Sequence, residues 1–333
     1  MKNTLLILTI MLLAFVSCKK EIKQANFVRT LTSGNVFGTY YNIQLFDTVK
    51  HNYEKQYDSL FNSVNKSMST YWKDSDITKI NKGDTTVVVD AHFATVFQVS
   101  KEIYKSTNGF FDPTIGVLVN AWDFGPTGKI DDLNKLKIDS LMQTVGFDKV
   151  QLIKGKLNKQ KHTFIDFNAI AKGYGLDVIS SFLTAKGYQN YLIDIGGEVV
   201  ARGRNLVKQK PFGIGIEDPN FDGSSSQHKI ISLYNEAMAT SGVYRKFKMD
   251  ANGNKYAHII NPKTGYPSKT NILSVSVIAP NCTLADGYAT AFKAMGIEKV
   301  KTLLKTHPEL KVYFIYEDEK QNLQTLALNG FAE

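Results

Sequence analysis

The sequence predicts a single α+β domain, with a mostly antiparallel sheet and packed helices. Its 333 residues are 43% hydrophobic and 21% charged, a globular composition that can bury a large core. Strand-like and helix-like segments follow one another without the regular alternation of a doubly wound parallel sheet. No Pro-rich or charged linker divides the chain, so we expect one domain over residues 35–333.

The N-terminus resembles a lipoprotein signal peptide. An almost unbroken apolar run from Leu5 to Val16 follows a basic start, and it falls short of the roughly 20 residues that span a bilayer. Cys18 then stands at a lipobox-like position, where a cysteine is acylated, as with palmitate, and becomes the new N-terminus. We expect a signal peptide over 1–17, a lipidated tether over 18–34 and a membrane-anchored protein facing the periplasm or the cell exterior. The alternative is a plain secretory signal with an incidental cysteine; since Cys282 is the only other one, we expect no internal disulfide.

The first half of the domain predicts one strand and two helices. Residues 36–46 are rich in β-branched and aromatic side chains, as strands are. Residues 53–68 place Tyr57, Leu60, Phe61 and Val64 at the spacing of an amphipathic helix. A second helix is expected over 91–107, since Asn108-Gly109 is a common helix end.

The second half predicts further strands between two long helices. Residues 162–168 indicate a strand that leads into a helix over 169–186. Two short strands are expected within 191–202, around the Gly196-Gly197 turn. The remaining segments are expected as strands over 212–216 and 273–279 and as a helix over 285–307.

Charge composition argues against nucleic acid as a partner. The formal net charge is +9, but only Arg29, Arg202, Arg204 and Arg245 are arginines, and the lysines are scattered along the chain. Nucleic-acid readout favours a clustered, Arg-rich basic stripe. We interpret the lysines as a solvated surface.

Asp286 and Thr290 form the first candidate site. They stand four residues apart and therefore share one helix face, where a carboxylate and a hydroxyl offer two oxygen ligands of the kind that Mg²⁺ prefers. The alternative is that Thr283 and Asp286 form a helix capping box and only satisfy backbone amides.

The segment from Asp166 to Gly175 is the second candidate. Its expected helix N-terminus presents free amides, and Lys172 adds a positive charge, so an anionic phosphate could bind there. The alternative is an ordinary turn with Asp166 as helix cap and Lys172 in solvent.

His258 is the third candidate. It precedes Ile259 and Ile260 and a turn shaped by Pro262 and Gly265, and an imidazole can act as a general base near neutral pH. The alternative is a structural histidine beside an apolar run. No Ser/His/Asp elbow, HExxH motif or Cys/His cluster appears, which disfavours acyl-enzyme and zinc chemistry.

Taken together, these segments resemble the ApbE family of FAD:protein FMN transferases. The resemblance covers nearly all of the chain after its first segment and consists of eight motifs in the family's order. They are Phe37-Gly38-Thr39-Tyr40, Met68-Ser69-Thr70-Tyr71 with Ser75-Asp76-Ile77 and Asn81, Gly109–Gly116 with Val119–Gly125, Asp166–Tyr174, Ile195–Glu198, Ala239–Arg245, His258–Pro267, and Ala285-Asp286.

The resemblance implies an enzyme that binds FAD with Mg²⁺, cleaves its pyrophosphate and transfers FMN to a Ser or Thr hydroxyl of another protein, with release of AMP. It implies that Asp286, Thr290 and the backbone carbonyl of Ala169 hold the metal, and that His258 is the base beside the transferred phosphoryl group. The residues implied to contact the flavin nucleotide are Phe37, Tyr71, Phe110, Phe111, Asp112, Asp166, Lys172 and Ile260. Phe37 stands where the family has Met, a change that could alter ring packing without stopping the chemistry.

Family acceptors resemble Asp-x-x-Ser/Thr-Gly-Ala/Ser-Ser/Thr. The nearest string in this chain, over 238–244, lacks the acid and the final hydroxyl residue, so we predict that the protein does not modify itself. We expect an acceptor in trans, such as a membrane redox subunit. Two alternatives are an FAD pyrophosphatase that uses water in place of the acceptor, and a flavin-binding lipoprotein without turnover.

Overall fold

A large antiparallel sheet with helices on one face confirms the predicted α+β class. The computed structural model describes residues 26–220, 226–242, 247–249 and 255–331. The sheet has eight strands in the order β1-β2-β5-β6-β9-β12-β13-β14, and all neighbouring strands are antiparallel. These strands are β1 (Val28–Val36), β2 (Thr39–Asp47), β5 (Tyr191–Ile195), β6 (Glu198–Arg202), β9 (Ala237–Gly242), β12 (Ile272–Ala279), β13 (Lys311–Glu317) and β14 (Leu323–Leu328).

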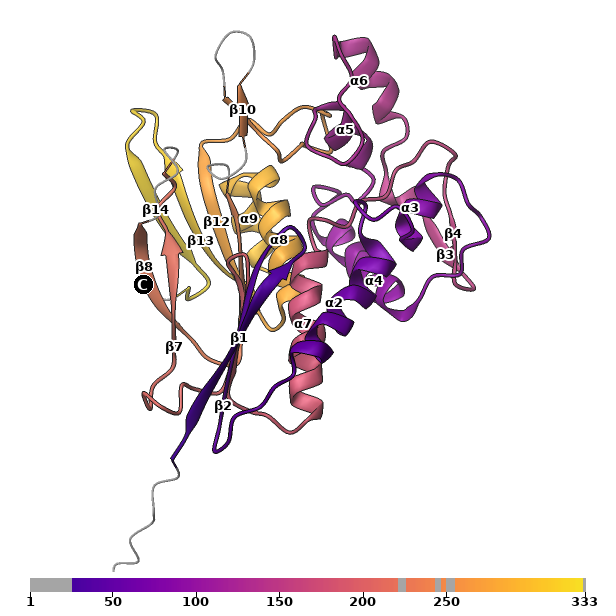
Figure 1. The fold of residues 1–333 in the computed structure, drawn as a ribbon. Helices are drawn as coiled ribbons and strands as arrows, with labels where there is room; N and C mark the ends of the chain where they lie inside the picture. Colours follow the sequence, from indigo (N-terminus) through magenta and orange to yellow (C-terminus); the bar gives the residue numbers. More distant parts are fainter. Residues whose placement is uncertain (1–25, 221–225, 243–246, 250–254, 332–333) are drawn as a thin grey trace, which may run out of the picture.

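The helices cover one face of this sheet, and a two-stranded ribbon covers part of the other (Figure 1). The helices are α2 (Glu54–Met68), α3 (Asp76–Asn81), α4 (Ala91–Ser106), α5 (Gly116–Ala121), α6 (Lys135–Met142), the 3-10 turn η1 (Phe147–Lys149), α7 (Ala171–Ala185), α8 (Cys282–Met295) and α9 (Ile297–Leu304). The paired short strands are β3 (Gln151–Ile153) with β4 (Lys156–Asn158), β7 (Phe212–Glu217) with β8 (Gln227–Leu233), and β10 (Phe247–Met249) with β11 (Lys255–Ala257).

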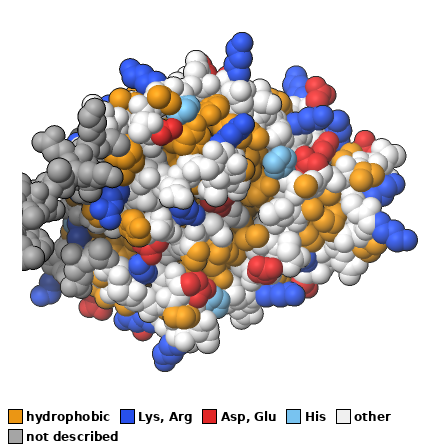
Figure 2. Space-filling model, turned by 90° about the horizontal axis from the view of Figure 1, so that it is seen from below, with side chains coloured by type: hydrophobic (Ala, Val, Ile, Leu, Met, Phe, Trp, Pro, Cys, Tyr) orange, Lys and Arg blue, Asp and Glu red, His pale blue; other side chains and the backbone are white. Residues whose placement is uncertain are grey.

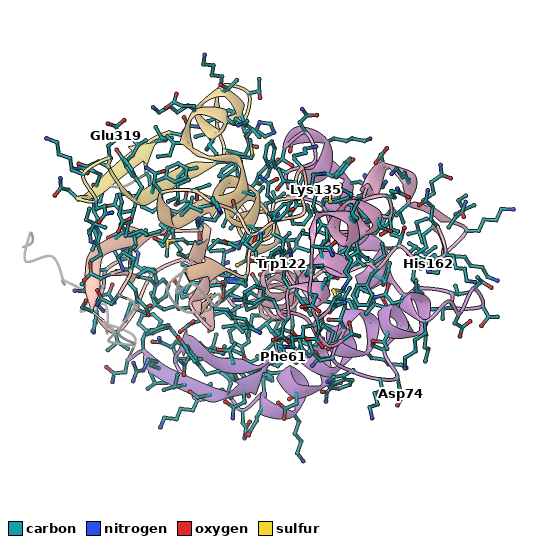
Figure 3. The ribbon with its side chains drawn as sticks, turned by 90° about the horizontal axis from the view of Figure 1, so that it is seen from above. Phe61, Asp74, Trp122, Lys135, His162 and Glu319 are labelled. Carbon is teal, nitrogen blue, oxygen red and sulfur yellow. The ribbon has the colours of Figure 1, made fainter. Side chains whose placement is uncertain are left out.

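Three buried clusters hold these layers together. The largest joins α2, α4 and α8 to β12 and β13, and a second joins α2 and α7 to β2 and β5. The third lies on the opposite side of the sheet, between the β7–β8 ribbon and β6, β9, β12 and β13. Seen from above, the helical half and the sheet half lie side by side, with Trp122 near the middle and Glu319 at the outer end of the sheet (Figure 3). No helix among the described residues is long and apolar enough to cross a bilayer.

Helix α8 runs through the centre of the protein and is buried along nearly all its length. It carries Lys293, whose side chain is only 1% exposed. The ammonium of Lys293 donates a hydrogen bond to Thr270 Oγ1 at 2.7 Å, and burial lowers the pKa of Lys293 to about 8.

Several elements differ from the prediction. The region expected as one strand over 36–46 contains a turn at Phe37 and Gly38, both with positive φ, that separates β1 from β2. β1 begins at Val28 and pairs with β2 along its whole length, so 28–34 belong to the sheet rather than to a tether. The expected helix over 285–307 is two helices, because the chain breaks at Gly296 with φ +82°.

Residues 162–168 do not form the expected strand. Their backbone is satisfied in another way: the side-chain amide of Asn81 binds both the N–H and the C=O of Ile165, and Asp166 N donates to the carbonyl of Pro113. Because these partners are a side chain and a loop, no ladder forms beyond the single bridge between Ile115 and Phe164.

Lysine and arginine side chains are spread among acidic, hydrophobic and other side chains on the face shown in Figure 2, without a continuous basic stripe. This distribution agrees with the scattered lysines of the sequence.

Candidate active site

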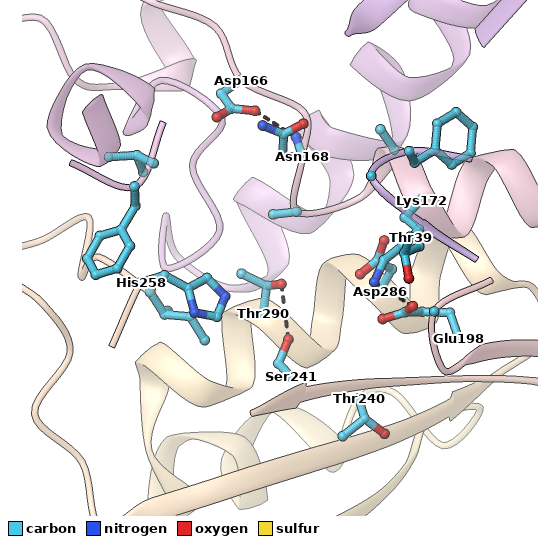
Figure 4. A pocket seen from close by; sticks show the side chains of 18 of the residues that line it. Thr39, Asp166, Asn168, Lys172, Glu198, Thr240, Ser241, His258, Asp286 and Thr290 are labelled. Atoms are coloured by element: carbon cyan, nitrogen blue, oxygen red, sulfur yellow. Dashed lines mark hydrogen bonds and ion pairs between the residues drawn. The ribbon is translucent and has the colours of Figure 1, made fainter. Parts of the chain in front are cut away.

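A cavity of about 870 Å³ lies where the sheet meets α7, α8 and the loops of the helical half. Figure 4 shows part of its wall, with Lys172, Glu198 and Asp286 at one end and His258 at the other. Every described residue that the sequence assigned to a site lines this cavity. These residues are Phe37, Tyr71, Phe110, Phe111, Asp112, Asp166, Ala169, Lys172, His258, Ile260, Asp286 and Thr290. Cys18 lies outside the described residues.

Asp286 and Thr290 project from one face of α8, as their spacing predicts. Asp286 Oδ2 accepts a hydrogen bond of 2.9 Å from the amide of Gly173 in the first turn of α7. Thr290 Oγ1 lies 3.3 Å from the hydroxyl of Ser241 on β9. α8 is capped by Asn281, whose Oδ1 accepts from Leu284 N, so the alternative of a capping box with Thr283 is wrong.

Asp177 fixes the start of α8 against α7. Its carboxylate accepts hydrogen bonds from the amides of Cys282 and Thr283, at 2.9 and 2.8 Å, and from the Thr283 hydroxyl at 2.5 Å. Burial raises the pKa of Asp177, although these hydrogen bonds favour the charged form. We call α7 and α8, with these cross-links, the helix frame.

Lys172 and Asp286 of the helix frame form a charged group with Glu198 of β6, and both carboxylates are buried. Lys172 Nζ lies 2.5 Å from Glu198 Oε2, and Glu198 is only 4% exposed. Burial first, and then the charge of Glu198, raise the pKa of Asp286 to about 7. Burial lowers the pKa of Lys172, but the charges of Glu198 and Asp286 outweigh it and hold that pKa above its usual value. Two carboxylates face one ammonium, which favours a further cation beside Asp286.

The oxygen atoms near Asp286 fit a magnesium ion. The predicted donors are a carboxylate, a hydroxyl and the carbonyl of Ala169, all of them hard oxygen ligands. Within the described ranges no three His, Cys, Asp or Glu side chains gather into a metal cluster. This composition suits Mg²⁺, which typically takes one or two protein carboxylates and keeps its other positions for water and phosphate.

Aromatic side chains line the other part of the cavity, and we call them the aromatic wall. They come from turns: Phe37 from the β1–β2 turn, Tyr71 and Trp72 after α2, and Phe110 and Phe111 after α4. Tyr71 and Trp72 are 59% and 43% exposed, so large flat surfaces remain available to a ligand. Such faces stack on planar rings.

Two of the predicted acids differ in their surroundings. The Asp112 carboxylate is buried and accepts hydrogen bonds from the amide and hydroxyl of Thr114 and from the amide of Phe147, so it holds the loop after α4 in shape. Asp166 accepts from Asn168 N at 2.7 Å and lies five residues before α7 begins. Because α7 has no side-chain cap, the alternative of Asp166 as its cap is wrong.

His258 is half-buried and lies at the end of the cavity opposite Glu198 (Figure 4). Its ring approaches Phe124 with a centroid separation of 6.2 Å. Ile260, two residues later, is buried and lines the same cavity. His258 is therefore placed where it can reach a bound ligand.

Sequence reasoning missed Asp177, Glu198 and Ser241 as members of the site. Glu198 follows the Gly196-Gly197 turn within a quoted motif, and an acid directly after a tight turn at a strand start was a usable signal. Asp177 and Ser241 act through partners more than 40 residues away, so no local spacing marks them.

Comparisons with known proteins bear on the chain as a whole and show its family. Residues 37–314 match the model of the ApbE family. The chain is 33% identical to FAD:protein FMN transferase of Haemophilus influenzae, over 92% of this chain and 90% of that one, and 34% identical to the Vibrio cholerae protein of the same name, over 90% and 89%. Among solved structures, the fold is similar to flavin transferase ApbE from Vibrio cholerae, with a TM-score of 0.81 and 32% identity over 90% of this chain and 97% of that one. It is also similar to the apo form of the Pseudomonas stutzeri flavinyl transferase ApbE, with a TM-score of 0.79 and 26% identity over 90% and 95%. This chain belongs to the ApbE family.

Proposed function

We propose that this protein is an FAD:protein FMN transferase that uses Mg²⁺, modifies a Ser or Thr hydroxyl and releases AMP. The observation that carries the proposal is the single cavity in which Asp286, Thr290 and Lys172 lie together with the aromatic wall. A flavin dinucleotide needs both kinds of surface, since it has two planar ring systems joined by a charged pyrophosphate. The curated relatives that carry this name support the same activity.

The helix frame is suited to hold the pyrophosphate. Asp286, Thr290 and the carbonyl of Ala169 would hold Mg²⁺, which neutralises charge on phosphate oxygens when bound. Lys172 adds a positive charge that Glu198 keeps in place, 2.5 Å away. Phosphoryl transfer needs mainly such positioning and charge stabilisation.

The aromatic wall is suited to hold the rings of FAD. Phe37, Tyr71 and Phe110 offer ring surface from three separate turns, and Phe111 lines the cavity although it is only 2% exposed. Asp166 lines the same part of the cavity and can accept a hydrogen bond from the nucleotide.

His258 is suited to take the proton of the acceptor hydroxyl on a ring nitrogen. In the proposed step the hydroxyl oxygen forms a bond to the FMN phosphorus, the bond from that phosphorus to the AMP oxygen breaks, and AMP leaves. The proton passes to the His258 imidazole.

We propose that the acceptor is a separate protein, such as a membrane redox subunit. Within this chain the hydroxyl residues of the string nearest to the acceptor pattern, Thr240 and Ser241, are held in β9 by its pairing with β12. Covalent flavin on the purified protein after incubation with FAD would contradict this part of the proposal.

We also propose that the protein is a lipoprotein anchored through Cys18. The apolar run before Cys18 supports an exported chain. The tether is then shorter than the sequence suggested, because β1 begins at Val28. Mass spectrometry of the membrane-extracted protein tests this: a diacylglyceryl or acyl adduct on Cys18 is expected, and an unmodified cysteine would contradict it.

Intact-mass spectrometry of a candidate acceptor domain tests the activity. After incubation with enzyme, FAD and Mg²⁺, the acceptor is expected to gain the mass of one FMN less one water, and neither a chelator sample nor Asp286→Ala should give this gain. Free FMN and AMP without an adduct would instead favour a pyrophosphatase. Intact FAD with every acceptor tried would favour a flavin carrier.

A further inference from the structure

Strand β9 extends beyond its neighbour β6 at the cavity. β6 pairs with β9 only through Val199 with Met238 and Val200 with Ala237. On its other side β9 stays paired with β12 as far as Gly242. β6 stops because the β5–β6 hairpin turns at Gly196-Gly197. Within the part of the chain that the structure describes, no strand pairs with Thr240–Gly242 on the β6 side.

The backbone groups that face this gap follow from the strand's alternation. Ala201 N of β6 donates to the carbonyl of Glu236 at 3.0 Å, so the backbone of Glu236 points toward β6. Orientation repeats every second residue in a strand, and the N–H and C=O groups of Thr240 and Gly242 therefore point the same way. An edge of this kind is a template for another extended chain.

This edge lies inside the cavity and beside the proposed metal ligands. Thr240, Ser241 and Gly242 all line the cavity. In Figure 4 the Ser241 side chain points to Thr290, whereas Thr240 points to the opposite side of the strand. A chain added at this edge would pass next to the Ser241–Thr290 contact.

The cavity wall around the edge differs from the aromatic wall. On the ribbon side it consists of Gly215, Ile216 and Glu217, with Met238 from β9, and none of these is aromatic. The surfaces suited to the rings of FAD therefore lie in the aromatic wall. The part of the cavity beside β9 and the ribbon remains available to the acceptor protein. Transfer to a protein requires that a segment of polypeptide enter the cavity.

We propose that the acceptor protein docks as an extended strand on the free edge of β9, using the backbone groups of Thr240 and Gly242. The segment continues the sheet in the gap beyond β6 and brings its hydroxyl beside Thr290. This inference rests on the proposed transferase function. Recognition through main-chain hydrogen bonds leaves only a few side-chain positions to set specificity.

A matched pair of variants tests the backbone N–H of Gly242, which one variant removes and the other retains. Gly242→Pro deletes the N–H that faces the gap, and proline is tolerated at strand edges of this kind. The ladder to β12 does not use that N–H, so the fold is kept, as circular dichroism will show. Gly242→Ala retains the N–H and is the control. We expect Gly242→Pro to raise the KM for the acceptor at least about tenfold relative to Gly242→Ala, which corresponds to about 1.4 kcal/mol. The Kd for FAD should agree within about twofold between the two variants. An acceptor KM equal in both variants would overturn the proposal.

Hydrogen exchange on the unmodified enzyme separates the possible occupants. The probe is a synthetic peptide with the Asp-x-x-Thr-Gly-Ala-Thr pattern, added to enzyme that holds FAD and Mg²⁺. The amides of Thr240 and Gly242 are expected to exchange more slowly when the peptide is added, and to be unaffected by FAD alone. Protection by FAD alone would assign the edge to the nucleotide, and no protection at saturating peptide would place the acceptor elsewhere. Mass spectrometry measures the FMN adduct on the peptide separately, and the absence of this adduct contradicts the transferase function. The docking site is judged only from the slower exchange of the two amides.

Discussion

The helix frame and the aromatic wall face the same cavity but are built in different ways. In the helix frame, carboxylates tie α7 to α8: Thr283 N donates a hydrogen bond to Asp177, and Gly173 N donates one to the buried Asp286. In the aromatic wall, Tyr71 and Trp72 lie on turns and are largely exposed. Groups that meet the reacting phosphates must be fixed in place, because small displacements are costly in phosphoryl transfer. Groups that bind planar rings can shift with their loops at little cost.

The largest effect on activity is expected when the Asp286 carboxylate of the helix frame is removed. Asp286→Ala should lower kcat for FMN transfer by roughly 10³-fold, about 4 kcal/mol, since metal-assisted charge stabilisation is worth several kcal/mol. Asp139→Ala, an exposed carboxylate on α6, is the control. Steady-state transfer assays measure both variants. Activity of Asp286→Ala within tenfold of the unmodified enzyme would remove this residue from the metal site.

A variant of Lys293 tests how much the burial of this lysine on α8 lowers the free energy of unfolding. Its pKa is about 8 in the folded protein against 10.5 as its ordinary value, so below pH 8 the folded state pays the full penalty of burying the charge. Between pH 8 and 10.5 the unfolded chain binds more protons, and stability rises with pH by up to about 3 kcal/mol. Lys293→Met should therefore be more stable than the unmodified protein at pH 7, and this rise should disappear. Urea unfolding at pH 7, 8.5 and 10 measures the free energy of unfolding of both proteins. An equal increase of that free energy with pH in the two proteins would contradict the prediction.

Gly173 tests the contact between α7 and α8 directly. A Cβ atom there would lie 2.2 Å from the carbonyl oxygen of Cys282 and 2.8 Å from Asp286 Cβ. Gly173→Ala must push the helices apart, with an expected loss of about 1–3 kcal/mol in stability and a fall in kcat on the order of tenfold. Gly128→Ala meets no atom within 4 Å and serves as the control. Thermal melts and transfer assays measure the Tm and kcat of both variants. Equal Tm and kcat in Gly173→Ala and Gly128→Ala would show that the close approach of α7 and α8 is unimportant.

The smallest effect is expected in the aromatic wall. Phe37 packs edge-on against Phe61, with a centroid separation of 5.6 Å, and its φ of +51° belongs to the turn. Phe37→Met introduces the residue typical of the family and should change the KM for FAD by roughly twofold, about 0.5 kcal/mol, with kcat unchanged. A large change in kcat would show that the wall also positions the reacting phosphate.

Local sequence patterns predicted the long helices of the domain but not α3, α5 and α6, and most residues of the cavity were implied by the resemblance to the ApbE family. α2, α4 and α7 begin and end within two residues of the expected bounds, because their apolar spacing and end signals are local. The failures depend on distant partners. Residues 162–168 do not form the expected strand, because the side chain of Asn81 binds the backbone of Ile165. Residues 28–34 form a strand because they pair with β2. In the same way, the role of Asp177 depends on α8, which begins more than 100 residues later.

The order of strands and helices also has a consequence for synthesis. The sheet begins with β1 and β2 from the start of the domain, but Asp286 and Thr290 arrive on α8, and β13 and β14 close the opposite edge. A chain released early could therefore assemble the turns that carry Phe37 and Tyr71 and still lack both Asp286 and Thr290. Pairings between segments so far apart also make folding slow, since long loops must close first. Under the proposed function, the site is therefore complete only once α8 has been made.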